Sequence, residues 1–153
     1  MSLNRIAPYA ELTYQIIGAA MAAHNKLGPG HKEAVYQALL TDEMVARGLS
    51  VEAERRIEVV VDEKVYGVLY LDHLVNEAVV VECKAVSHLL TREEVAQVIT
   101  YLAATGLPVG ILINFGRHRM EYKRVFRPKK LDDWPRYIAP YLWRPPGAGR
   151  VNP

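Results

Sequence analysis

Two stretches near the start of the chain repeat their hydrophobic residues with the period of an α-helix. The first predicts a helix over about residues 8–26 that ends at the Gly28-Pro29-Gly30 segment. The second predicts a helix over about residues 31–47 that ends at Gly48, because glycine readily adopts the left-handed conformation of a helix cap. Both helices carry an apolar face, so both are expected to pack against the rest of the domain.

Runs of β-branched and apolar residues in the middle of the chain predict strands, the first two joined at Asp62-Glu63-Lys64. The expected strands cover residues 57–61, 65–71, 78–83, 108–114 and 120–126. Between the third and fourth strands, Thr91 caps a predicted helix that runs to about residue 105 before Gly106. The order α-α-β-β-β-α-β-β therefore predicts an α/β fold, with a mixed central sheet flanked by helices.

Composition supports one ordinary domain, since 50% of the 153 residues are hydrophobic and 24% are charged. No apolar run approaches the roughly 18 to 20 residues of a membrane span, and the first residues lack the apolar stretch of a signal peptide. We therefore expect no membrane partner and a cytoplasmic location. The single cysteine, Cys83, cannot form an internal disulfide and is most simply a core residue, so any metal must be held by oxygen or imidazole.

Charge is distributed unevenly along the chain, although the net charge is only +2. Residues 1–116 hold 9 basic and 14 acidic side chains, whereas residues 117–153 hold 10 basic and 3 acidic ones. Such a basic segment can contact phosphates or can be a solvated tail, and the pattern leaves both open. Its first part places two aromatic residues, Tyr122 and Phe126, among Arg117, Arg119, Lys123, Arg124, Arg127, Lys129 and Lys130.

The apolar strand Val79-Val80-Val81 ends in Glu82-Cys83-Lys84, which is the strongest local sign of chemistry. The two-residue period of a strand puts Glu82 and Lys84 on one face, and Asp72 at the end of the preceding strand can pair beside Glu82. Two neighbouring carboxylates repel unless a cation neutralises them, and Mg²⁺ binds such oxygen ligands. The spacing fits a metal site assisted by Lys84 and equally a strand-end salt bridge.

Two helices offer further polar groups at helical spacing. Glu33, Tyr36 and Gln37 share one face of the second helix, which supplies a third carboxylate. Gln97 and Tyr101 lie four residues apart on the third helix and present an amide and a phenol together. Taken separately, the last two are also explained as an exposed glutamine and a tyrosine at the edge of the core.

Several separated blocks of the chain, within about residues 10–126, resemble those of the GxxExxY family, which is placed in the PD-(D/E)XK nuclease superfamily. The first block is Gly30-His31-Lys32-Glu33-Ala34-Val35-Tyr36. The later blocks follow in the family's order: Asp72, Glu82-Cys83-Lys84-Ala85-Val86, Gln97-Val98-Ile99-Thr100-Tyr101-Leu102 and Leu112-Ile113-Asn114-Phe115. The resemblance implies a restriction-endonuclease-like core, which we assign to residues 1–128. The basic, proline-rich residues 129–153 lie beyond the resemblance and are assigned to a C-terminal extension.

The resemblance also implies roles for individual residues. By it, Glu33, Asp72 and Glu82 are the metal-binding acids, and Lys84 is the lysine of the motif. The helix pair Gln97 and Tyr101 would contact the nucleic-acid backbone or support the metal site, with Tyr36 as another supporting residue. One departure is mild: the residue before Asp72 is Leu71, where the superfamily's motif has proline.

Together the residues and the resemblance predict a hydrolase, a nuclease that uses Mg²⁺ with Mn²⁺ as a possible substitute. DNA is the favoured substrate over RNA, and a homodimer is possible. Two alternatives stay open from the sequence: a catalytically silent module that binds nucleic acid or a partner protein, and a hydrolase of small phosphoesters.

Overall fold

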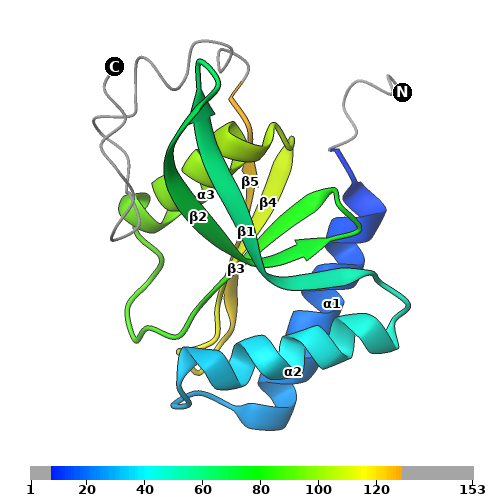
Figure 1. The fold of residues 1–153 in the computed structure, drawn as a ribbon. Coiled ribbons are helices and arrows are strands. Elements are labelled where there is room, and N and C mark those ends of the chain that lie inside the picture. The colour runs from blue at the N-terminus through cyan, green and yellow to red at the C-terminus, as the bar shows by residue number, and fades with distance from the viewer. Residues whose placement is uncertain (1–7, 129–153) are drawn as a thin grey trace, which may run out of the picture.

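The computed structural model of this chain describes residues 8–128, which form a five-stranded sheet with helices on both faces (Figure 1). The strands lie side by side in chain order, β1-β2-β3-β4-β5, and only β3 and β4 run parallel. The elements, in chain order, are α1 (Ala10–Leu27), α2 (Glu33–Ala46), β1 (Val51–Val61), β2 (Lys64–Val75), β3 (Val79–Lys84), α3 (Arg92–Thr105), β4 (Val109–Asn114) and β5 (Glu121–Phe126). The predicted element order and the restriction-endonuclease-like α/β fold are confirmed.

The helix ends follow the local signals in the sequence. At the start of α3 the Thr91 hydroxyl accepts a hydrogen bond from the Glu94 backbone while the Glu94 carboxylate accepts one from the Thr91 backbone, a complete capping box. Gly106 ends α3 in the left-handed conformation. After α2, Gly48 also has a positive φ of 82°, one residue beyond the Arg47 cap. Local chemistry therefore sets these boundaries to within about two residues of the predictions.

The first two strands are longer than the sequence predicts. β1 begins at Val51 rather than near residue 57, and β2 continues to Val75 rather than ending near residue 71. The early part of β1 was missed because residues 53–56 are all exposed and mostly charged. β1 pairs only with β2, so these side chains need no apolar neighbours, and the resulting long hairpin extends beside α3 (Figure 1).

Two hydrophobic clusters fill the spaces on the two faces of the sheet. One joins α1 and α2 to alternate residues of β3, namely Val79, Val81 and Cys83. The other joins α3 to Val80 and to apolar residues of the β1–β2 hairpin, including Leu69. This alternation places Cys83 in the core, as predicted, and directs its neighbours to the α3 face.

The basic, proline-rich extension over residues 129–153 lies outside the described residues. Within residues 8–128, no helix is both long enough and apolar enough to cross a membrane.

Candidate active site at the carboxyl end of β3

Asp72 and Glu82 meet where β2 and β3 stop pairing. The antiparallel ladder between these strands covers residues 73–75 of β2, with His73 opposite Val81. One step further along, the backbone N–H of Asp72 donates to Glu82 Oε1 at 3.0 Å, and the backbone N–H of Cys83 donates to Asp72 Oδ2 at 2.9 Å. At this point the two carboxylates connect the strands in place of backbone pairing, because each accepts a hydrogen bond from the backbone of the other strand. The predicted pairing of Asp72 with Glu82 is found.

This arrangement leaves a buried carboxylate beside a second one. Glu82 is only 2% exposed, and burial together with the neighbouring Asp72 carboxylate raises its pKa well above the usual value. The Lys84 ammonium acts in the opposite direction and lowers the pKa of Glu82. A bound cation would offset the same desolvation and repulsion, so the geometry favours a positive partner at this point.

Glu33 shares this environment from a different element. It is the first residue of α2, where the helix dipole stabilises an acid, and its Oε2 accepts a hydrogen bond from Gln37 Nε2 at 3.1 Å. Burial raises the pKa of Glu33, the Asp72 carboxylate raises it further, and Lys84 lowers it. The structure therefore brings the N-terminus of α2 to the same end of the sheet as the strand acids.

Gln97 and Tyr101 cover the site from α3. Both are largely buried, and Gln97 Nε2 donates to the Tyr101 hydroxyl at 2.9 Å. Burial raises the pKa of Tyr101, and the Glu82, Asp72 and Glu33 carboxylates raise it further. The phenol is therefore a neutral hydrogen-bonding group that lies within the electrostatic range of all three acids. The alternative of an exposed glutamine is wrong.

Tyr36 lies one helical turn after Glu33 on α2, and its contacts are structural. Its ring stacks on Phe115 with centroids 4.8 Å apart and an interplanar angle of 9°, and its hydroxyl donates to the Gly28 carbonyl. The backbone N–H of His31 donates to the same hydroxyl at 3.3 Å. Tyr36 therefore fixes the α1–α2 loop against Phe115, the residue that follows β4.

His73 is a residue that the sequence reading did not use. It points to the α2 side, is fully buried, and places Nε2 2.8 Å from Thr41 Oγ1 and 3.2 Å from the Gln37 carbonyl. Burial lowers its pKa, so the ring is held in the neutral form. Because Gln37 also contacts Glu33, His73 ties the strand that carries Asp72 to the helix that carries Glu33. Only the packing of α2 reveals the partners of His73, because they lie more than thirty residues away in the chain.

The carboxylates of the site supply some, but not all, of the oxygen ligands that a hard divalent cation needs. No three histidine, cysteine, aspartate or glutamate side chains within residues 8–128 converge into a ready-made metal cage. Mg²⁺, however, is commonly bound by one or two carboxylates with water and substrate oxygens completing its shell. Asp72 and Glu82 each keep one oxygen outside the two strand-crossing hydrogen bonds, and this pair suits such a site.

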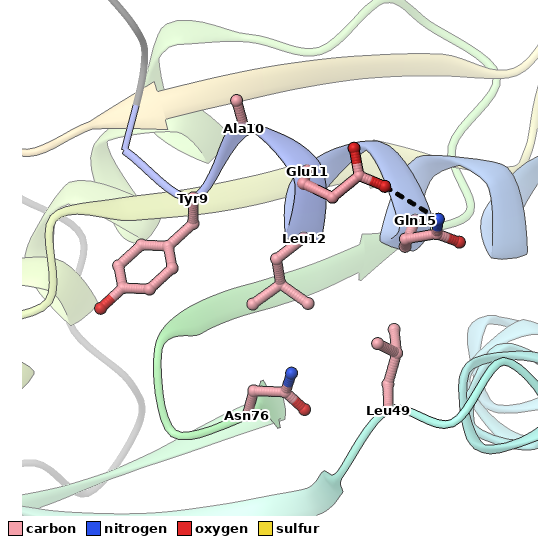
Figure 2. A pocket seen from close by; sticks show the side chains of 7 residues that line it. All are labelled: Tyr9, Ala10, Glu11, Leu12, Gln15, Leu49 and Asn76. Atoms are coloured by element: carbon pink, nitrogen blue, oxygen red, sulfur yellow. Dashed lines mark hydrogen bonds between the residues drawn. The ribbon is translucent and has the colours of Figure 1, made fainter. Parts of the chain in front are cut away.

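A separate hollow lies beyond the opposite ends of α2 and β3 from Glu33 and Glu82, and Figure 2 shows its lining. It lies between the first turns of α1, Leu49 and the turn at Asn76, and Gln15 donates to Glu11 along its wall at 3.1 Å. It contains none of the acids discussed above, and its polar groups include no converging set. The carboxyl end of β3 is therefore the better candidate for chemistry.

Two strand acids, a lysine two residues later and a helix-borne acid thus lie at one end of this mixed sheet. Residues 10–125 match the family model of the PD-(D/E)XK nuclease superfamily, and the chain belongs to this superfamily. Its members are typically nucleases that hydrolyse phosphodiesters and generally use divalent metal ions.

Other comparisons add little to this assignment. A solved structure titled "Crystal structure of SSO0001" is similar over 82% of this chain and 82% of its own, with 18% sequence identity and a TM-score of 0.48. No protein of curated function matches this chain.

Proposed function

We propose that this protein is a metal-dependent nuclease that hydrolyses phosphodiester bonds of nucleic acid, with DNA favoured over RNA. The proposal rests chiefly on the exchange of hydrogen bonds between Asp72 and Glu82 at the point where β2 and β3 separate. Burying Glu82 beside Asp72 is costly without a positive partner, and a site without a function has no need to keep the pair.

The metal would be Mg²⁺, with Mn²⁺ as a substitute, held by Asp72 and Glu82, with Glu33 completing the acidic side of the site. When bound, the ion would polarise the scissile phosphate and lower the pKa of a water molecule. Gln97 and Tyr101 would position the substrate backbone or the carboxylate of Glu82, because both lie on the same face as the acids and Tyr101 stays neutral.

Lys84 is the group proposed to assist hydrolysis directly. Water adds across a P–O bond, so one product end carries the phosphate and the other a hydroxyl group. The ammonium of Lys84 lies near Glu82 and Glu33 and would stabilise the negative charge that grows on the phosphate oxygens.

A cleavage assay tests the proposal. The substrates are linear duplex, circular, single-stranded and branched DNA, together with RNA, each incubated with Mg²⁺, Mn²⁺ or EDTA. We expect cleavage that requires the metal and is lost in Lys84→Ala, and cutting of circular DNA would identify an endonuclease. The folded state of the variant is checked by thermal denaturation.

Two results would overturn the proposal. A folded protein that binds metal and nucleic acid but cleaves no substrate would be a binding module. A protein that ignores nucleic acid but hydrolyses small phosphoesters would use the same groups on a different substrate. Cleavage that continues in Lys84→Ala would remove Lys84 from the mechanism.

Four further properties remain predictions: membership of the GxxExxY group, a cytoplasmic location, a homodimer, and the division into residues 1–128 and 129–153. Gel filtration with light scattering tests the homodimer. Deleting residues 129–153 and measuring both cleavage and thermal stability tests the division, because a separate extension should leave the melting temperature unchanged.

A further inference from the structure

The β4–β5 turn, residues 115–120, lies at the same end of the sheet as the acids. β3 and β4 are parallel, so Lys84 and Asn114 end their strands side by side, and Glu121 begins β5 opposite Asn114. The backbone N–H of Phe115 donates to the Lys84 carbonyl at 2.8 Å. The turn therefore starts one hydrogen bond away from the lysine of the proposed active site.

Several contacts hold the backbone of this turn in place. Asn114 Oδ1 accepts hydrogen bonds from the backbone N–H groups of Val86 and Gly116, at 3.1 and 3.0 Å. A Cβ on Gly116 would lie 2.4 Å from the Val86 nitrogen, so the turn packs directly on the segment that follows Lys84. On its other side, His24 Nε2 lies 2.9 Å from the Arg117 carbonyl and ties the turn to α1.

The side chains of the turn, in contrast to its backbone, are left available. Arg119 is exposed and Arg117 is half-buried, and neither guanidinium takes part in a hydrogen bond or ion pair within residues 8–128. On the β1–β2 hairpin, Arg55 and Arg56 are each paired with a glutamate. The two arginines of the turn thus have no carboxylate partner among the described residues, at the end of the sheet where the acids lie.

The structure also separates these two arginines from Arg124 and Arg127. β5 runs away from the site, so Phe126 lies opposite Val109, and the Arg127 backbone donates to the Pro108 carbonyl. The six residues of β5 span about 20 Å, so Arg127 lies at the opposite end of the sheet from Lys84. Arg124 faces α1 instead, where its Nε lies 3.4 Å from Thr13 Oγ1.

We propose that Arg117 and Arg119 form a phosphate-binding site that holds the nucleic-acid backbone next to the scissile phosphodiester. This inference rests on the proposed function. The three acids of the site repel a polyanion, so binding needs cations close to them, and a guanidinium matches the paired oxygens of a phosphate. His24 and Asn114 fix the backbone of the turn, so the two side chains would meet the nucleic-acid strand at this end of the sheet.

Binding measured against salt concentration tests the site. The Lys84→Ala protein, which is expected to bind without cleaving, is titrated into labelled DNA and RNA duplexes of one sequence at several NaCl concentrations. Replacing Arg117 and Arg119 together by alanine should weaken binding and reduce the slope of log K against log salt by about two, since each phosphate contact contributes about 0.9. The matched control is Lys64→Ala at the far tip of the hairpin, which should leave the slope unchanged.

A further variant separates the effect of the positive charge from the effect of the guanidinium shape. Replacing both arginines by lysine keeps the charge, so it should retain the slope even where the loss of the guanidinium fork weakens binding. Equal slopes for the alanine, lysine and Lys64→Ala proteins would overturn the phosphate site, and the proposed function would stand if the wild-type protein still cleaves. If the wild-type protein neither binds nor cleaves any nucleic acid, both proposals fail together.

Discussion

The two halves of β3 differ in what holds them to β2. The first half, Val79 to Val81, pairs with β2 through an ordinary backbone ladder and buries its valines on both faces of the sheet. In the second half, the Asp72 and Glu82 side chains accept the hydrogen bonds that connect the strands. The first half is satisfied by backbone pairing and burial, whereas the second half leaves two neighbouring carboxylates that favour a cation. Under the proposed function, the first half of β3 serves stability and the second half serves catalysis.

The largest expected effect is loss of activity in Lys84→Ala. Removing a cation that stabilises transition-state charge should lower the cleavage rate by about 10² to 10³-fold. Lys84 is half-buried at the end of the strand, so the melting temperature should change little. The counterpart in the first half of the strand is Val80→Ala, which should lower the melting temperature and leave the rate per folded molecule unchanged. A comparable loss of cleavage rate in both variants would contradict the proposed difference between the two halves of β3.

Two glycines of the β4 region provide a matched pair for the next effect. A Cβ on Gly110, beside the paired half, would lie 2.7 Å from Val98 Cγ1, and a Cβ on Gly116, beside the active-site half, would lie 2.4 Å from the Val86 backbone. Gly110→Ala should cost about 1–3 kcal/mol of unfolding free energy and spare catalysis. Gly116→Ala should displace the segment after Lys84 and lower the cleavage rate as well. Chemical denaturation and single-turnover cleavage measure the two effects, and equal rates in both variants would contradict the prediction.

His73 marks the boundary between the halves, because it occupies the last paired position before Asp72. His73→Leu keeps a side chain of similar size but leaves the Thr41 hydroxyl without its histidine partner. This loss should lower the free energy of unfolding by about 1–3 kcal/mol. Since α2 then loses a tie to the strand of Asp72, metal affinity should fall along with stability. Thermal denaturation with and without Mn²⁺ measures both. An unchanged Mn²⁺-induced shift in melting temperature would show that His73 acts on stability alone.

The smallest expected effect is a gain in stability. Burial and Asp72 raise the pKa of Glu82, so its contribution to folding is favourable at low pH and is lost as the pH rises through the folded-state pKa. In EDTA, Glu82→Gln should therefore be more stable than the wild type at pH 8, by about 1 kcal/mol, and similar at pH 5. Thermal melts across this pH range measure the difference. A variant that is less stable than the wild type at pH 8 would show that the carboxylate has a stabilising partner even without metal.

The amino-acid sequence by itself determined the order of the elements and indicated which acids the fold brings together. Periodicity, caps and turn residues are local properties, so they located three helices and five strands, and the two-residue period placed Glu82 on the face opposite Cys83. The spacing of Asp72 and Glu82 indicated that they could meet, because adjacent antiparallel strands bring such residues together.

The tertiary structure decided what no local pattern carries. The length of β1 depends on its pairing with β2, because its exposed charged residues resemble a loop when taken alone. The role of His73 depends on α2, which is more than thirty residues away in the chain. The separation of Arg117 and Arg119 from Arg127 depends on the direction of β5, which starts at the Lys84 end of the sheet and carries Arg127 to the far end. Contacts between distant segments set each of these features, and a local sequence pattern does not record such contacts.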